Sequence, residues 1–126
     1  MAPNEAFGWT WILVGFVTGL LLGLGFHRED WMGGYASARR RMLRLGHISF
    51  LGLGFVNLFF AFSSEHMRLS PAGLGLASWM LVLGGVTMPL CCGLMAWRPS
   101  TYPLFGVPVA SLVLGAALAA WGVLTP

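Results

Sequence analysis

Four sulfur-bearing residues repeat along one hydrophobic stretch at the spacing of a helical face. Met88, Cys91, Cys92 and Met95 stand at positions i, i+3, i+4 and i+7, so in a helix they form one stripe. Thiolate and thioether sulfurs favour Cu(I), and they also ligate haem iron. We therefore treat these residues as candidate metal ligands. The alternative is simple packing, because methionine and cysteine are ordinary residues of apolar helix contacts.

Two histidines lie near the charged connection between the first two hydrophobic stretches. His27 closes the first stretch, and His47 lies inside the second, shortly after Arg44. At about 1.5 Å per residue, His47, Met95 and Cys92 all lie about 5–9 Å inside the same membrane boundary. A haem b or copper site that combines His47 with His27, Met95 or Cys92 is one hypothesis. A shallow histidine that bonds to a neighbouring carbonyl is the alternative.

Four long hydrophobic stretches must position these residues. They cover residues 7–26, 42–63, 72–97 and 102–124, and each has the roughly 20 residues that a helix needs to cross a hydrocarbon core about 30 Å thick. Apolar residues make up 57% of the chain and charged residues only 9%, which is too few to solvate a soluble surface. The sequence predicts one all-α domain over residues 1–126, an integral membrane protein built as a four-helix transmembrane bundle.

The basic residues predict the orientation of this bundle. All seven are arginines, and five of them, Arg28, Arg39, Arg40, Arg41 and Arg44, lie between the first two stretches. The positive-inside rule makes that side cytoplasmic and places both termini on the periplasmic or exterior side. The absence of lysine is typical of GC-rich bacterial genomes, so we expect the bacterial inner membrane. We interpret the arginines Arg39, Arg40, Arg41 and Arg44 as groups that face anionic lipid headgroups or a partner, and not nucleic acid.

Aromatic residues at the ends of the stretches agree with this orientation. The outer aromatic belt would hold Trp9, Trp11 and Trp121, and the inner belt Trp97 and Tyr102. At the start of the third stretch, Ser70 is placed to cap a helix, and Pro71 fits its first turn.

Small and polar residues inside the stretches predict how the helices pack. Gly15, Gly19 and Gly23 form a ridge that lets another helix approach, either within this chain or from another subunit. Asn57 is expected to make an interhelical hydrogen bond. Pro89 removes a helical hydrogen bond and frees the carbonyl of Gly85, which predicts either a hinge or a kink that neighbouring helices satisfy.

The residues that are missing narrow the function. No carboxylate lies inside a stretch, which disfavours proton pumps and ion-coupled carriers. The chain has no nucleophile–base motif, no phosphate-binding glycine loop and no His-Glu-x-x-His motif. We expect a non-catalytic accessory subunit of a larger bacterial membrane complex, with electron transfer as its setting, that contacts other subunits or a second copy. The haem b or copper protein is the alternative hypothesis, and a small-solute channel ranks third.

Overall fold

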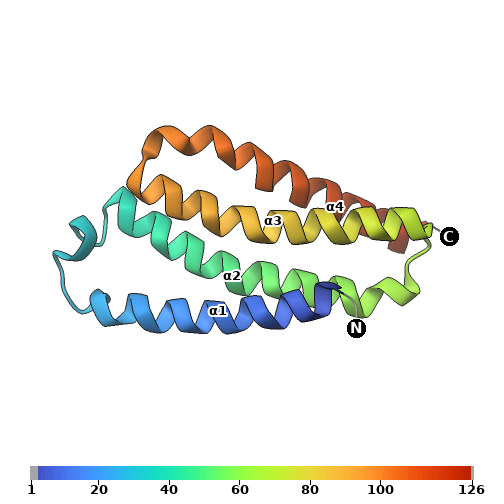
Figure 1. Cartoon of the computed structure of the whole chain (residues 1–126), viewed down its shortest axis with the longest axis horizontal. Coiled ribbons are helices and arrows are strands. Elements are labelled where there is room, and N and C mark those ends of the chain that lie inside the picture. The colour runs from blue at the N-terminus through green and yellow to red at the C-terminus, as the bar shows by residue number, and fades with distance from the viewer. Residues whose placement is uncertain (1–2, 126) are drawn as a thin grey trace.

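The computed structural model describes residues 3–125, which form four long helices joined by short connections (Figure 1). The long helices are α1 (Pro3–Phe26), α2 (Ala38–Ser63), α3 (Pro71–Trp97) and α4 (Gly106–Leu124). Three 3-10 turns lie between them, η1 (Trp31–Gly33), η2 (Ser64–His66) and η3 (Pro99–Phe105). Each long helix is long and apolar enough to cross a membrane. The expected all-helical architecture with four potential spans is therefore confirmed.

The helices run up and down, and each packs mainly on its neighbours in the chain. Extensive contacts join α1 to α2, α2 to α3 and α3 to α4, while α1 reaches α3 over a smaller area. The two chain ends lie at the same end of the molecule, which we call the terminal end (Figure 1). The opposite end carries the η1 connection and η3, and with them six of the seven arginines; we call it the arginine end.

Local residue chemistry explains where these helices begin. The side chain of Ser37 accepts a hydrogen bond from the N–H of Arg40 (3.1 Å), so α2 begins at Ala38 and includes the arginine run. Ser70 caps α3 in the same way through the N–H of Gly73 (3.1 Å), as expected. The fourth stretch differs from the prediction, because its α-helix starts at Gly106 and not near residue 102. Pro103 has no N–H to donate to Pro99, so the preceding turn is a 3-10 helix.

Glycines bring α1 and α2 into close contact near the terminal end. A Cβ atom added to Gly8 would lie 2.8 Å from the carbonyl oxygen of Gly54, and one added to Gly54 would lie 3.0 Å from the carbonyl oxygen of Gly8. The two backbones therefore meet with no room for a side chain at the crossing, which is the typical use of glycine between helices in lipid.

This close contact gives a first testable prediction. Gly8→Ala is expected to lower the free energy of unfolding by about 1–3 kcal/mol, because the added methyl group forces the two backbones apart. Gly23→Ala is the matched control, since a Cβ at Gly23 meets no atom within 4 Å. Unfolding of both variants in detergent, followed by circular dichroism, measures the difference. Equal stability of the two variants would contradict the close contact.

Candidate functional site

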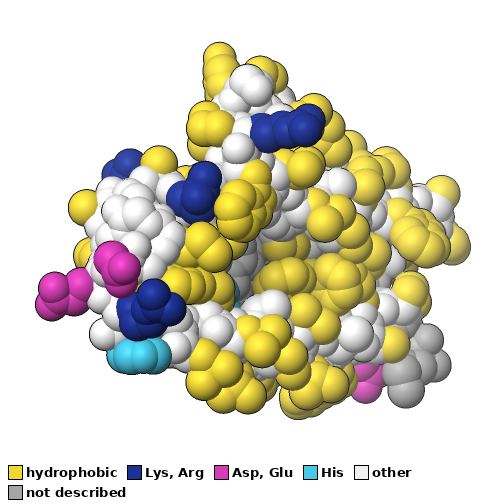
Figure 2. All heavy atoms as spheres, turned by 60° about the vertical axis from the view of Figure 1, so that its left-hand side comes forward, with side chains coloured by type: hydrophobic (Ala, Val, Ile, Leu, Met, Phe, Trp, Pro, Cys, Tyr) yellow, Lys and Arg dark blue, Asp and Glu magenta, His cyan; other side chains and the backbone are white. Residues whose placement is uncertain are grey.

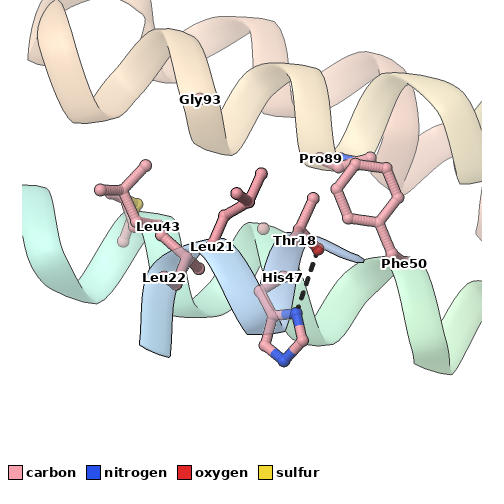
Figure 3. A pocket seen from close by; sticks show the side chains of 10 residues that line it. Thr18, Leu21, Leu22, Leu43, His47, Phe50, Pro89 and Gly93 are labelled. Atoms are coloured by element: carbon pink, nitrogen blue, oxygen red, sulfur yellow. Dashed lines mark hydrogen bonds between the residues drawn. The ribbon is translucent and has the colours of Figure 1, made fainter. Parts of the chain in front are cut away.

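A groove lined by residues of α1, α2 and α3 lies toward the arginine end of the molecule. It has a volume of about 250 Å³ and is almost entirely apolar. Its walls come from α1 and α3 and its floor from α2, and Figure 3 shows its side chains from close by. The lining residues are Thr18, Leu21, Leu22, Met42, Leu43, Gly46, His47, Phe50, Pro89 and Gly93.

The polar edge of this groove is a contact between His47 and Thr18. His47 Nδ1 lies 3.2 Å from Thr18 Oγ1, and the Thr18 hydroxyl donates to the carbonyl of Gly15 (3.0 Å). Because the single hydrogen of the hydroxyl is used toward Gly15, the Thr18 oxygen is left to accept a hydrogen bond from His47 Nδ1–H. A Cβ added to Gly19 would lie 2.7 Å from the imidazole Cε1 atom. The half-buried ring therefore packs over α1, turned away from Pro89 and Gly93 (Figure 3).

The sulfur-bearing residues of α3 lie in different helix contacts and do not form one cluster. Cys92 is buried against Gly46 of α2, where an added Cβ would lie 3.2 Å from the Cys92 Cβ. Cys91 is also buried, but its Sγ lies 3.5 Å from the carbonyl oxygen of Leu104 in η3. Met88 lines a shallow hollow between α2 and α3, and Met95 is half-buried. The two thiols thus serve two separate interfaces.

The expected cofactor ligands do not meet in one place. His27 is exposed at the end of α1, His47 packs on α1, and Cys92 packs between α2 and α3. Within residues 3–125, no three His, Cys, Asp or Glu side chains gather closely enough to hold a metal ion. No contact of the described residues therefore supports the haem b or copper hypothesis over simple packing.

Arg40 occupies a site that differs from its expected place facing lipid or a partner. Its side chain is only 3% exposed. The guanidinium donates to the carbonyl of Phe26 (3.0 Å) and, at 3.4 Å, to that of Arg28. Its carbon Cζ lies 4.7 Å from the Phe26 ring centroid and 5.6 Å from each of the Trp31 and Tyr35 centroids. Arg40 therefore satisfies the end of α1 inside an aromatic cage.

A second arginine of α2 does the same for α3. Arg39 Nε donates to the carbonyl of Ala96 (3.1 Å), and its guanidinium lies 4.5 Å from the Trp97 ring centroid. Neither α1 nor α3 has a basic residue in its own last turn, and each presents the negative end of its dipole there. The first turn of the antiparallel α2 thus supplies cations to the carboxyl ends of both neighbours.

Of the other residues expected to face lipid or a partner, some are exposed and some are covered by side chains of α2. Arg41 is exposed, and Arg44 lies 4.1 Å from the Tyr35 ring centroid. Gly15 is buried under Leu51 of α2, where an added Cβ would lie 2.6 Å from Leu51 Cδ2. Gly19 is covered by His47, so of the predicted glycine ridge only Gly23 remains open. Most of that ridge is used inside the chain.

A buried polar network ties the first three helices together at the terminal end. Asn4 Nδ2 donates to Asn57 Oδ1 (2.7 Å), and the Ser78 hydroxyl donates to Asn4 Oδ1. Asn57 Nδ2 donates to the carbonyl of Leu53 (2.8 Å). Asn57 is fully buried and Asn4 is 1% exposed. The predicted interhelical bond of Asn57 is confirmed, but Asn4 and Ser78 were not expected, since Asn4 precedes the hydrophobic stretch.

The carbonyl that Pro89 frees is satisfied by a neighbouring helix. Trp11 Nε1 of α1 donates to the carbonyl oxygen of Gly85 at 2.8 Å, and α3 continues through Pro89 to Trp97. This is the static alternative to a hinge, and it costs little because the lost helical bond is replaced. Trp11 was predicted to lie in the outer aromatic belt, but this hydrogen bond places it at the contact between α1 and α3. Trp9 and Trp121 are exposed.

Comparisons with protein-family models, with curated proteins and with solved structures find no match.

Proposed function

We propose that this protein is a non-catalytic accessory subunit of a larger membrane complex in the bacterial inner membrane. Its four helices span the bilayer with both termini on the outer side, and it binds a transmembrane helix of another subunit. The proposal agrees with the arginine distribution, since six arginines lie at one end and only Arg68 at the other.

The use of polar groups inside the helices supports a role without chemistry. Asn4, Asn57 and Ser78 bond to one another. Trp11 satisfies the carbonyl that Pro89 frees, and His47 bonds to Thr18. These groups therefore act as interhelical contacts, which is their common use in membrane helices. Because the polar groups inside the bundle are used in these contacts, we look for the functional feature on the outer surface of the helices.

One surface feature carries the proposal, an uncovered glycine of α2 beside α3. A Cβ added to Gly52 meets no atom within 4 Å, in contrast to Gly54 on the same helix. Gly52 lies in a shallow apolar hollow of about 370 Å³, lined also by Leu45, Ile48, Ser49, Leu53, Val56 and Met88. A glycine that no side chain of residues 3–125 covers allows the backbone of a foreign helix to approach closely. A transmembrane helix of another subunit fits this shape and chemistry.

Co-purification tests the proposal. The tagged protein is extracted from its native membranes in a mild detergent, and the proteins that stay bound are identified and quantified. We expect Gly52→Leu to reduce the recovery of the bound subunit about tenfold or more, because the side chain fills the hollow. Gly75→Leu is the matched control, since Gly75 is equally uncovered but lies outside the hollow.

Three results would count against this function. Recovery of no membrane subunit with the wild-type protein would overturn it, as would equal losses in the two variants. Recovery of a second, differently tagged copy as the main bound species would replace the foreign subunit by self-association.

A further inference from the structure

We propose that the arginine end holds one anionic phospholipid, with its phosphate between Arg39 and Arg98 beside Trp97 and one acyl chain in the groove between α1 and α3. The site rests on membrane insertion but not on the accessory role. It lies on a different surface from Gly52, because no residue lines both hollows.

The groove has the chemistry of an acyl-chain site and room for part of one chain. A second hollow of about 330 Å³ is lined by Pro89, Leu90, Gly93, Leu94, Trp97 and Arg98. It shares Pro89 and Gly93 with the groove that His47 borders, so the two form one continuous path along α3. From Pro89 to Trp97 this path extends about 12 Å at 1.5 Å per residue. The walls of the groove beside His47 are almost wholly apolar, and Arg98 lies in the second hollow. Gly93 leaves the path open, since a Cβ added there meets no described atom within 4 Å.

Two arginines at the mouth of the path have no carboxylate partner among residues 3–125. Arg39 and Arg98 are both exposed, and Arg39 is held over the Trp97 ring at 4.5 Å. Arg39 uses Nε for the carbonyl of Ala96, which leaves its two terminal nitrogens for a ligand. Among residues 3–125 the one ion pair is Arg28 with Asp30, at 4.0 Å. Figure 2 shows the arginines of this end around a hollow of hydrophobic side chains.

The combination favours an anionic lipid over other occupants. Arginine binds phosphate oxygens through a planar fork of donors, and Trp97 suits the headgroup level. A free phosphate would use the arginines but leave the apolar path empty. A partner helix would fill the path, but it would not explain why the charge gathers at its mouth. In the expected orientation the site faces the cytoplasmic leaflet, whose anionic lipids attract arginine.

Native mass spectrometry of the detergent-solubilised full chain tests the site. The protein is titrated with phosphatidylglycerol and with phosphatidylcholine of the same chain length. We expect one phosphatidylglycerol to bind about tenfold more tightly than phosphatidylcholine. The double variant Arg39→Gln/Arg98→Gln should lose this preference. Gly93→Leu should weaken the binding of both lipids about equally, since the leucine side chain blocks the acyl-chain path without changing the charge.

The controls separate the site from general charge effects and from the accessory role. Arg68→Gln removes the same charge at the terminal end, and we expect it to bind phosphatidylglycerol as the wild type does. Arg98→Gln alone is expected to keep the fold, because the Arg98 side chain makes no hydrogen bond within residues 3–125. This single variant should still bind phosphatidylglycerol more weakly than the wild type.

Equal binding of the two lipids, or equal losses in Arg68→Gln and Arg98→Gln, would overturn the proposal. So would displacement of the lipid by inorganic phosphate or by dihexanoyl phosphatidylglycerol at matched concentration, since neither fills the acyl-chain path. Lipid binding does not depend on the partner recovered in the co-purification, so each proposal can fail without the other.

Discussion

Replacing Asn57 by leucine is expected to lower the free energy of unfolding by about 1–2 kcal/mol, although leucine is the more apolar residue. Asn57 accepts a hydrogen bond from Asn4 (2.7 Å) and donates to the carbonyl of Leu53 (2.8 Å) at a fully buried position. The substitution leaves the Asn4 amide with only the weaker bond to the carbonyl of Ser78 (3.3 Å). A buried polar group that loses its partner pays the cost of its lost hydration.

A double-mutant cycle gives the sharpest form of this prediction. The double variant Asn4→Leu/Asn57→Leu should lose less free energy of unfolding than the two single variants lose together. Removing both partners leaves no unpaired amide between them. Reversible unfolding by SDS in bicelles measures all four proteins. The matched control is Thr10→Val, since within residues 3–125 the Thr10 hydroxyl bonds only to the carbonyl of Ala6 in its own helix. Strict additivity of the two substitutions would show that the bond between Asn4 and Asn57 contributes nothing.

The helices could be predicted from the sequence because span length is a property of the chain alone. Hydrophobic stretches of about 20 residues mark the four helices whatever their neighbours are. The cap at Ser70, which was predicted, is local in the same sense. The start of α4 was misplaced because hydropathy does not register that Pro103 lacks the N–H for a helical bond, and residues 99–105 form a 3-10 turn instead.

The candidate site could not be predicted in the same way, because it depends on the rotation of each helix about its axis. Cys91 and Cys92 are neighbours in sequence, yet one meets Leu104 and the other Gly46. A step of about 100° per residue turns adjacent side chains toward different helices, so a shared stripe does not ensure a shared site. Equal depth likewise placed His47 beside Cys92, although His47 faces α1.

The arginine run shows a related limit. Three arginines lie in the first turn of α2, where their positive charge opposes the dipole of that helix. This unfavourable placement is a signal from which the sequence could have predicted a partner outside α2. In an antiparallel arrangement the same turn lies beside the carboxyl ends of α1 and α3, where cations are favoured. Topology therefore predicts two trans caps. Which arginine serves which helix depends on the rotation of α2 about its axis, and in the structure Arg40 caps α1 and Arg39 caps α3.

Removing the Arg40 side chain is expected to have the largest effect of any single substitution at the arginine end. Arg40→Ala should lower the free energy of unfolding by about 3 kcal/mol, because it removes two charge-assisted hydrogen bonds and empties the aromatic cage. The η1 connection should also loosen, because Trp31 and Tyr35 lose their common partner. Unfolding in detergent measures the first effect, and the rate of limited proteolysis within residues 27–37 measures the second.

Two further variants separate the cage from the charge. Arg40→Lys keeps the charge but lacks the planar fork, so it should recover only part of the lost stability. Arg41→Ala removes the same charge one residue later from an exposed side chain, and it should change the free energy of unfolding by less than about 0.5 kcal/mol. If Arg41→Ala costs as much as Arg40→Ala, the stabilising factor is the total positive charge of this end. If only Arg40→Ala is costly, a trans cap from α2 holds the end of α1, and the exposed arginines remain free to bind a ligand.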